Sequence, residues 1–117
     1  MTAITWNLRL VLKDGQRSNF EDLMREMVVA ARNETGCQTY DWYVTAEGAE
    51  VHILERYTDP EATMIHLANF GAHFADRFFA CVTPQDFTVY GHANDDIRGA
   101  LGPLGAVFMG PLGGFRR

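Results

Sequence analysis

Four segments of the chain have the hydrophobic pattern of β-strands. In the first, Ile4, Trp6 and Leu8 occupy alternate positions, and this period of two is typical of a strand with one buried face. The second and third segments are separated by a short turn at Glu47-Gly48, which predicts a β-hairpin. The four predicted strands span residues 4–12, 37–45, 51–57 and 87–90.

Three further segments are predicted to be helical. In the first, apolar residues recur at spacings of three and four from Phe20 to Ala31, which is the pattern of a helix that buries one face. A capping box at Ser18 and Glu21 predicts the start of the first helix, and Gly36 is placed to end it. Asp59, which is followed by a proline, predicts the start of the second. We expect Gly71 to break the second helix. The predicted helical segments span residues 20–31, 60–70 and, beyond the break, 72–80.

The order of these elements is β-α-β-β-α-β, which predicts an α+β fold of the ferredoxin-like type. Right-handed crossovers would place the helices on one face of a four-stranded antiparallel sheet. The strands nevertheless carry large apolar side chains in both registers, as at Ile53 and Leu54 or at Trp42 and Tyr43. The face without helices therefore needs a cover. A second copy of the chain is the commonest cover, so we expect a homodimer.

Composition and charge narrow the classes of function. The chain has 117 residues, enough for one domain with its own core. Its formal net charge of −5 disfavours binding to nucleic acid or to an anionic membrane surface. Cys37 and Cys81 lack the spacing of a zinc site and are expected to be free thiols. Arg9 interrupts the apolar run near the N-terminus, so no secretory segment is predicted, and we expect a cytoplasmic protein.

Residues 94–117 differ in composition from the rest of the chain. Six of the eleven glycines lie there, together with Pro103 and Pro111. The segment also keeps many apolar residues, which a disordered tail would lack. We therefore divide the chain into a ferredoxin-like domain, residues 1–93, and a C-terminal arm, residues 94–117. The arm is expected to pack on its own subunit or on the partner subunit.

From residue 32 onward the chain carries a set of short motifs, which are Glu34-Thr-Gly36-Cys37 with Tyr40, then Glu55-Arg-Tyr57-Thr-Asp59, then Glu61-Ala62 with His66-Leu67, and His73-Phe74. In this combination they resemble the antibiotic biosynthesis monooxygenase (ABM) family. The resemblance covers about residues 4–92 and implies a dimeric α+β barrel, in which two ferredoxin-like subunits pack sheet to sheet. The family includes quinol oxidases, oxygenases of polyketide aromatics and haem-degrading enzymes.

Three polar residues are candidate catalytic groups. His66 shares a helix face with Phe70, and an ordinary pKa near neutrality suits a general base, although a histidine satisfied in the core or at a dimer interface would fit the same pattern. Asn7 is a neutral amide in a strand whose other residues are mainly apolar or basic. Glu55 lies among apolar strand neighbours and must be paired if it is buried. Arg9 on the adjacent first strand is a possible partner in a structural ion pair. The alternative is that Glu55 is a pocket carboxylate with a raised pKa.

These residues, with the resemblance, predict a cofactor-independent monooxygenase that acts on an electron-rich phenol or quinol. The substrate would lose a proton to His66 in a dry pocket, Asn7 would donate a hydrogen bond to the anion, and the anion would react with O₂. The four histidines lack metal-binding spacing and no glycine-rich phosphate loop is visible, so no metal or nucleotide cofactor is expected. The predicted walls of the pocket are Trp42, Tyr57, Phe70, His73 and Phe74.

Three alternatives stay open from the sequence. The first is a dimer of the same fold that binds a small molecule without catalysis, and the second is a structural dimer whose pocket is filled by side chains. The third, implied by the resemblance, is a haem-degrading monooxygenase, in which Asn7 would line the pocket. The resemblance also counts against haem, because Asp76 stands where those relatives carry their iron-ligating histidine, and His73 lies three residues earlier.

Overall fold

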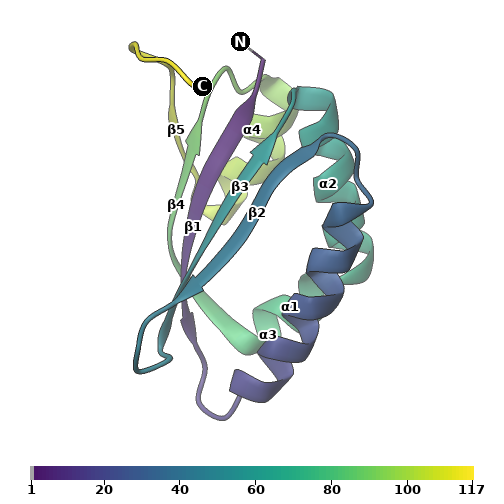
Figure 1. Cartoon of the computed structure of the whole chain (residues 1–117), viewed down its shortest axis with the longest axis vertical. Helices are drawn as coiled ribbons and strands as arrows, with labels where there is room; N and C mark the ends of the chain where they lie inside the picture. The colour runs from purple at the N-terminus through teal and green to yellow at the C-terminus, as the bar shows by residue number, and fades with distance from the viewer. Residues whose placement is uncertain (1) are drawn as a thin grey trace.

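The computed structural model of the chain describes residues 2–117 and confirms the predicted ferredoxin-like order of elements (Figure 1). The strands are β1 (Ile4–Leu12), β2 (Cys37–Val44), β3 (Glu50–Tyr57), β4 (Val82–Tyr90) and β5 (Val107–Met109). The helices are α1 (Arg17–Arg32), α2 (Pro60–His73), α3 (Ala75–Cys81), α4 (Asp95–Leu101) and the short 3₁₀ helix η1 (Gly102–Leu104).

The sheet has five strands in the order β2-β3-β1-β4-β5. The four predicted strands pair antiparallel, whereas β5 is supplied by the C-terminal arm and pairs parallel to β4. The prediction of a four-stranded antiparallel sheet was therefore incomplete. A three-residue strand is too short for a period-two pattern to reveal it.

The strand register decides which side chains face the helices. Trp6 on β1 lies opposite Glu55 on β3 and Val89 on β4, so these three residues share one face. All three are buried, and the helices cover this face of the sheet (Figure 1). Asn7 and Leu54 are also paired but point to the opposite face, because successive residues of a strand alternate. This second face carries no helix, and we call it the open face.

The core consists of two adjoining clusters between the sheet and the helices. The first includes Leu10 on β1 with Phe20 on α1 and Phe78 on α3. The second includes Trp6 on β1 with Leu101 on α4. Burying one such apolar side chain contributes about 1.5–3 kcal/mol to folding. The helical stripe predicted for α1 is confirmed, and its buried residues are Phe20, Leu23, Met27 and Ala31.

Two helix boundaries differ from the predictions. Helix α1 begins at Arg17, its N-cap Gln16 makes no side-chain cap hydrogen bond, and Ser18 lies inside the helix, so the predicted capping box was wrong. Helix α2 continues through Gly71 to His73. A helical glycine costs only about 1 kcal/mol, which tertiary packing on either side can outweigh. The predicted N-cap of α2 is confirmed, because the side chain of Asp59 accepts a hydrogen bond from the backbone N–H of Ala62 at 2.8 Å.

The last core strand is longer than predicted. Strand β4 begins at Val82 and contains Pro84, which lies opposite Leu10. The register between β1 and β4 shifts at Arg9/Leu10, and a proline is tolerated at such an irregularity. No helix in the described part of the chain is long and apolar enough to cross a membrane.

The C-terminal arm packs on its own subunit as far as β5. Asn94 caps α4, since its side-chain oxygen accepts a hydrogen bond from the N–H of Ile97 at 3.0 Å. Ile97 and Leu101 are buried in the core. Beyond β5 the chain is exposed, including Leu112 and Phe115.

Candidate active site

His66 lies on the buried side of α2 between two carboxylates. Its Nδ1 is 2.8 Å from Oε1 of Glu34, and its Nε2 is 3.2 Å from Oε1 of Glu55. All three side chains are at least nine-tenths buried. Glu34 comes from the loop between α1 and β2, and Glu55 from the middle of β3. We call these three residues the carboxylate–histidine cluster.

The two carboxylates change the protonation of the imidazole. Burial alone would lower the pKa of His66, but the hydrogen bonds and negative charges of Glu55 and Glu34 together outweigh it and raise that pKa. A protonated imidazole donates from both ring nitrogens, which matches a carboxylate on each side. The cluster therefore favours an imidazolium, and with both carboxylates ionised it carries one net negative charge.

Further hydrogen bonds extend the cluster at both ends. The hydroxyl of Tyr57 donates to Oε1 of Glu55 at 2.6 Å, and the amide of Asn69 donates to Oε2 of Glu34 at 3.2 Å. Burial, then the charge of Glu55, raises the pKa of Tyr57, so this hydroxyl stays a donor. Among the hydrogen bonds and ion pairs of residues 2–117, Glu55 uses only Oε1. Its second oxygen is therefore available to a ligand.

A close approach between two backbones brings Glu34 to His66. A Cβ atom added to Gly36 would lie 2.3 Å from the Cβ of Ala62, far inside van der Waals contact. Only glycine allows the loop before β2 to rest on the first turn of α2. Because Ala62 and His66 are four residues apart on one helix face, the same contact places Glu34 beside the imidazole.

The cluster borders a small cavity between the sheet and the helices. The cavity has a volume of about 90 Å³ and opens partly to solvent. Tyr40 on β2 lies opposite Glu55 on β3, and the ring centroids of Tyr40 and His66 are 5.5 Å apart. These three polar side chains therefore gather at one end of the cavity. The lining consists of Trp6, Leu8, Met27, Tyr40, Ile53, Glu55, His66, Leu67, Phe70, Phe78, Phe79, Pro84, Phe87, Leu101 and Leu104.

The structure places three of the predicted site residues at this cavity, namely His66, Glu55 and Phe70. Tyr57 reaches the site through Glu55 and packs against His66, with ring centroids 4.8 Å apart, but it does not line the cavity. Trp42 faces the helices and borders a separate hollow beside Phe20.

The remaining predicted site residues lie elsewhere. His73 is exposed at the end of α2, and Phe74 packs against the core cluster that contains Phe78. Asn7 points to the open face, because it alternates with Trp6 along β1. The prediction that Asn7 and His66 share one pocket was therefore wrong within this subunit.

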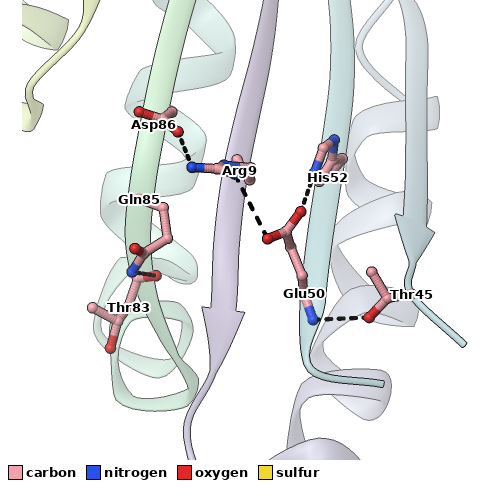
Figure 2. Close-up of polar contacts among 7 residues, drawn as sticks. All are labelled: Arg9, Thr45, Glu50, His52, Thr83, Gln85 and Asp86. Atoms are coloured by element: carbon pink, nitrogen blue, oxygen red, sulfur yellow. Dashed lines mark hydrogen bonds and ion pairs between the residues drawn. The ribbon is translucent and has the colours of Figure 1, made fainter. Parts of the chain in front are cut away.

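Arg9 is not the partner of Glu55. Figure 2 shows Arg9 on β1 between Asp86 on β4 and Glu50 on β3, with an Nη1–Oε1 distance of 3.8 Å to Glu50. Glu50 also contacts Nε2 of His52 at 2.8 Å. These residues belong to the register of the open face, whereas Glu55 belongs to the face covered by the helices.

Sequence reasoning missed three members of the site, namely Glu34, Tyr40 and Asn69. Glu34 and Tyr40 belong to the first motif that resembles the ABM family, but the sequence alone assigns no role to them. Glu34 and His66 are 32 residues apart along the chain, and neither periodicity nor spacing reports a contact over that separation. Asn69 follows His66 by three residues, so it shares the same helix face, and this signal was available.

The cluster has few features of a metal or haem site. Among residues 2–117 no group of three or more His, Cys, Asp or Glu side chains is arranged to hold a metal ion. The residues considered for haem do not converge, since Asn7 is on the open face and His73 is exposed. Cys37 and Cys81 are free thiols. Burial and the charges of Glu34 and Glu55 raise the pKa of Cys37 to about 11, so this thiol is protonated near neutrality.

Comparison with known proteins identifies the family. A sequence model of the antibiotic biosynthesis monooxygenase family matches residues 3–81, and the chain belongs to this family. A Mycobacterium tuberculosis protein, Rv0793, which carries a provisional monooxygenase name, is 37% identical over 49 residues. That match covers 42% of this chain and spans only 48% of the length of Rv0793.

Solved structures agree on the fold. MupZ from Pseudomonas fluorescens is 20% identical, with a TM-score of 0.88, and the superposition covers 100% of this chain and 96% of MupZ. SnoaB from Streptomyces nogalater, described as a cofactor-independent oxygenase, is 16% identical with a TM-score of 0.67, covering 80% of this chain and 96% of SnoaB. At these identities the likeness shows a shared α+β architecture of the dimeric-barrel type.

Proposed function

We propose that this chain is a cofactor-independent monooxygenase whose substrate is a neutral, electron-rich phenol or quinol. The observation that carries the proposal is the carboxylate–histidine cluster at one end of an otherwise apolar cavity. Membership of the ABM family supports monooxygenase chemistry. The description of SnoaB as a cofactor-independent oxygenase supports the absence of a cofactor requirement.

Glu55 is the proton acceptor in this proposal, and His66 assists it. The earlier expectation that His66 itself is the base fits the geometry poorly, because both ring nitrogens already contact carboxylates. The second oxygen of Glu55 can accept the hydroxyl proton of the substrate. The neighbouring imidazolium offsets the negative charge that develops on the phenol, and such preorganised charge is effective in a dry site.

Tyr40 supplies a hydrogen bond to the anion. Its side chain lines the cavity next to His66. Burial, then the charge of Glu55, raises the pKa of Tyr40, so its hydroxyl remains protonated and can donate. A phenol has a pKa of about 10, and a donor aimed at the phenolate oxygen makes its ionisation at neutral pH easier.

The oxidation is balanced without an external reductant. The phenolate transfers one electron to O₂, and the resulting superoxide recombines with the ring radical at a carbon that carries hydrogen. The ring hydroperoxide then loses water and leaves a quinone. One oxygen atom of O₂ enters the product, the other leaves as water, and the substrate supplies all the electrons.

A protein that binds the same ligands without oxidising them remains the second candidate. It is favoured by one observation, namely that both ring nitrogens of His66 are already satisfied within the protein. If the two contacts of His66 serve only to hold the fold together, the imidazole takes no part in a reaction. Ligand binding without oxygen consumption would identify this case.

Oxygen uptake with a panel of hydroquinones, naphthols and anthrone-like phenols tests the proposed function. We expect one panel member to consume one O₂ per quinone formed, with an unchanged rate after exhaustive chelation. Isotopically labelled O₂ should place one labelled atom in the quinone. Uptake that depends on added metal or flavin, or binding of panel members with no uptake, would contradict the proposal.

A further inference from the structure

The C-terminal arm contributes one wall of the cavity. Leu101, the last residue of α4, and Leu104, the last residue of η1, both line it. These two residues lie well beyond residues 3–81, the part of the chain that the family model matches. The wall is thus built by a segment that follows the ferredoxin-like core. This segment, residues 99–109, contains no ionisable side chain.

The two leucines differ in how firmly they are held. Leu101 is 1% exposed, whereas Leu104 is 48% exposed. Leu104 therefore lies at the mouth of the cavity, with one side toward the interior and the other toward water. Moving this side chain outward breaks little packing, whereas moving Leu101 would disturb the core.

The backbone on both sides of Leu104 is fixed. Before it, Ile97 and Leu101 anchor α4 in the core. After it, the N–H of Gly105 donates to the carbonyl of Gly102 at 2.9 Å, and Gly105 has a φ of 85°, which favours glycine. Strand β5 then pairs with β4, and Arg98 lies 4.7 Å from the ring centroid of Phe108. The turn is held in place, so the Leu104 side chain is the adjustable part of this wall.

The size of the cavity makes this wall important. Its volume of about 90 Å³ is smaller than the roughly 150 Å³ of an engineered cavity that holds benzene. A ligand with its hydroxyl at Glu55 must therefore extend toward the mouth. We propose that Leu104 is a specificity-determining residue, which sets how many fused rings a hydroxyl-bearing aromatic ligand of this cavity can have. The inference rests on the proposed use of the cavity as the ligand site, and it does not depend on the reaction with O₂.

The test compares one-ring and two-ring ligands, using phenol and 2-naphthol in calorimetric titrations of the full chain. Leu104→Ala enlarges the mouth and Leu104→Trp fills it. Leu112→Ala and Leu112→Trp are the matched controls, because Leu112 is fully exposed outside the cavity lining. Circular dichroism and thermal unfolding of each variant verify that the fold is kept.

We expect Leu104→Ala to raise the preference for 2-naphthol over phenol by about tenfold, the scale on which a hydrophobic pocket distinguishes small differences in ligand size. Leu104→Trp should weaken 2-naphthol binding by about tenfold while phenol changes less, and both Leu112 variants should match the parent. If Leu104→Trp does not fold, Leu104→Ala decides alone.

An unchanged preference in the folded Leu104 variants would overturn the proposal, and so would failure of both probes to bind the parent. If the size preference shifts as expected but no quinol consumes O₂, only the proposed function fails, and the chain is a size-selective binding protein.

Discussion

His66 allows two carboxylates to be buried in one site. Glu34 and Glu55 would repel each other if both were ionised without a cation between them. The imidazolium contacts both, and the aromatic rings of Tyr40 and Tyr57 lie within 5.5 Å of it, centroid to centroid. Removing the ring would leave two buried carboxylates unpaired, and loss of one partner of a buried ion pair costs about 3–5 kcal/mol. A His66→Ala variant would therefore test stability before it tests catalysis.

Glu55→Gln is the sharper test of the chemistry. Glutamine keeps the size of the side chain and its hydrogen bond from Tyr57, but it cannot take a proton from a phenol. We expect the rate of quinol oxidation to fall by about 10²-fold or more, the usual scale of general base catalysis. Initial rates of oxygen consumption measure this effect.

Glu50→Gln is the matched control for this prediction, because Glu50 lies on the same strand but on the open face (Figure 2). The Glu50→Gln variant should oxidise the quinol at the same rate as the parent protein. A Glu55→Gln protein that is folded and fully active would show that the proton goes elsewhere.

The raised pKa of His66 also predicts how stability depends on pH. Between the ordinary histidine pKa of about 6.5 and the raised value in the folded state, the folded protein binds more protons than the unfolded one. The free energy of unfolding should therefore decrease as pH rises from 6 to 8. Urea denaturation at several pH values measures this slope.

Glu34→Gln should reduce the slope of stability against pH, because it removes one of the two charges that raise the pKa of His66. Glu47→Gln, in the exposed turn of the β-hairpin, should leave the slope unchanged. A slope of the opposite sign would mean that His66 is buried in its neutral form.

Among the elements of the fold, the loop before β2 and the first turn of α2 position the cluster. The Gly36→Ala change would force the two apart, because the added Cβ would overlap that of Ala62. We expect a loss of about 1–3 kcal/mol in the free energy of unfolding, the usual cost of overpacking. Weaker quinol oxidation should accompany it, since Glu34 would move away from His66.

The control for this substitution is Gly71→Ala, inside α2. A Cβ at Gly71 would meet nothing within 4 Å, and alanine is favoured over glycine in a helix by about 0.5–1 kcal/mol. Denaturant unfolding should therefore show Gly36→Ala to be less stable than the parent and Gly71→Ala to be more stable. Equal effects would mean that the packing of Gly36 on Ala62 does not hold the loop.

The core elements could be predicted from the sequence because each carries its own local signal. The period of β1 and the Asp59 cap of α2 are short-range patterns, and both are found in the structure. Gly71 failed as a helix breaker because a local propensity yields to packing. The site could be predicted only in part, because the contact of Glu34 with His66 depends on how two distant segments meet. Asn7 was placed at the pocket because of the family resemblance, although its alternation with Trp6 and Leu8 along β1 puts it on the other face of the sheet.

At the scale of the whole molecule, the two faces of the sheet are unequal. The helices, including α4 of the C-terminal arm, cover one face (Figure 1), and the cavity lies between them and the sheet. The open face bears large exposed apolar side chains on several strands, including Tyr43 on β2, Leu54 on β3 and Tyr90 on β4. Within residues 2–117, Oδ1 of Asn7 and Nε of Arg9 are buried there without a hydrogen-bond partner, and such groups usually find one.

These features lead us to expect that a second copy of the chain covers the open face. Arg9 is flanked by Asp86 and Glu50 (Figure 2), so the charges at the centre of this face are largely paired within the subunit. The open faces of two copies can therefore pack together without strong repulsion. Light scattering at micromolar concentration should give twice the subunit mass.

Leu54→Lys places a charge in the middle of the open face and should yield folded monomers, because an unpaired charge is costly to bury. Ile65→Lys, at an exposed position of α2, should remain a dimer. A parent protein with the mass of one subunit, or a dimer that Ile65→Lys disrupts and Leu54→Lys does not, would place the interface elsewhere and leave the open face in contact with water.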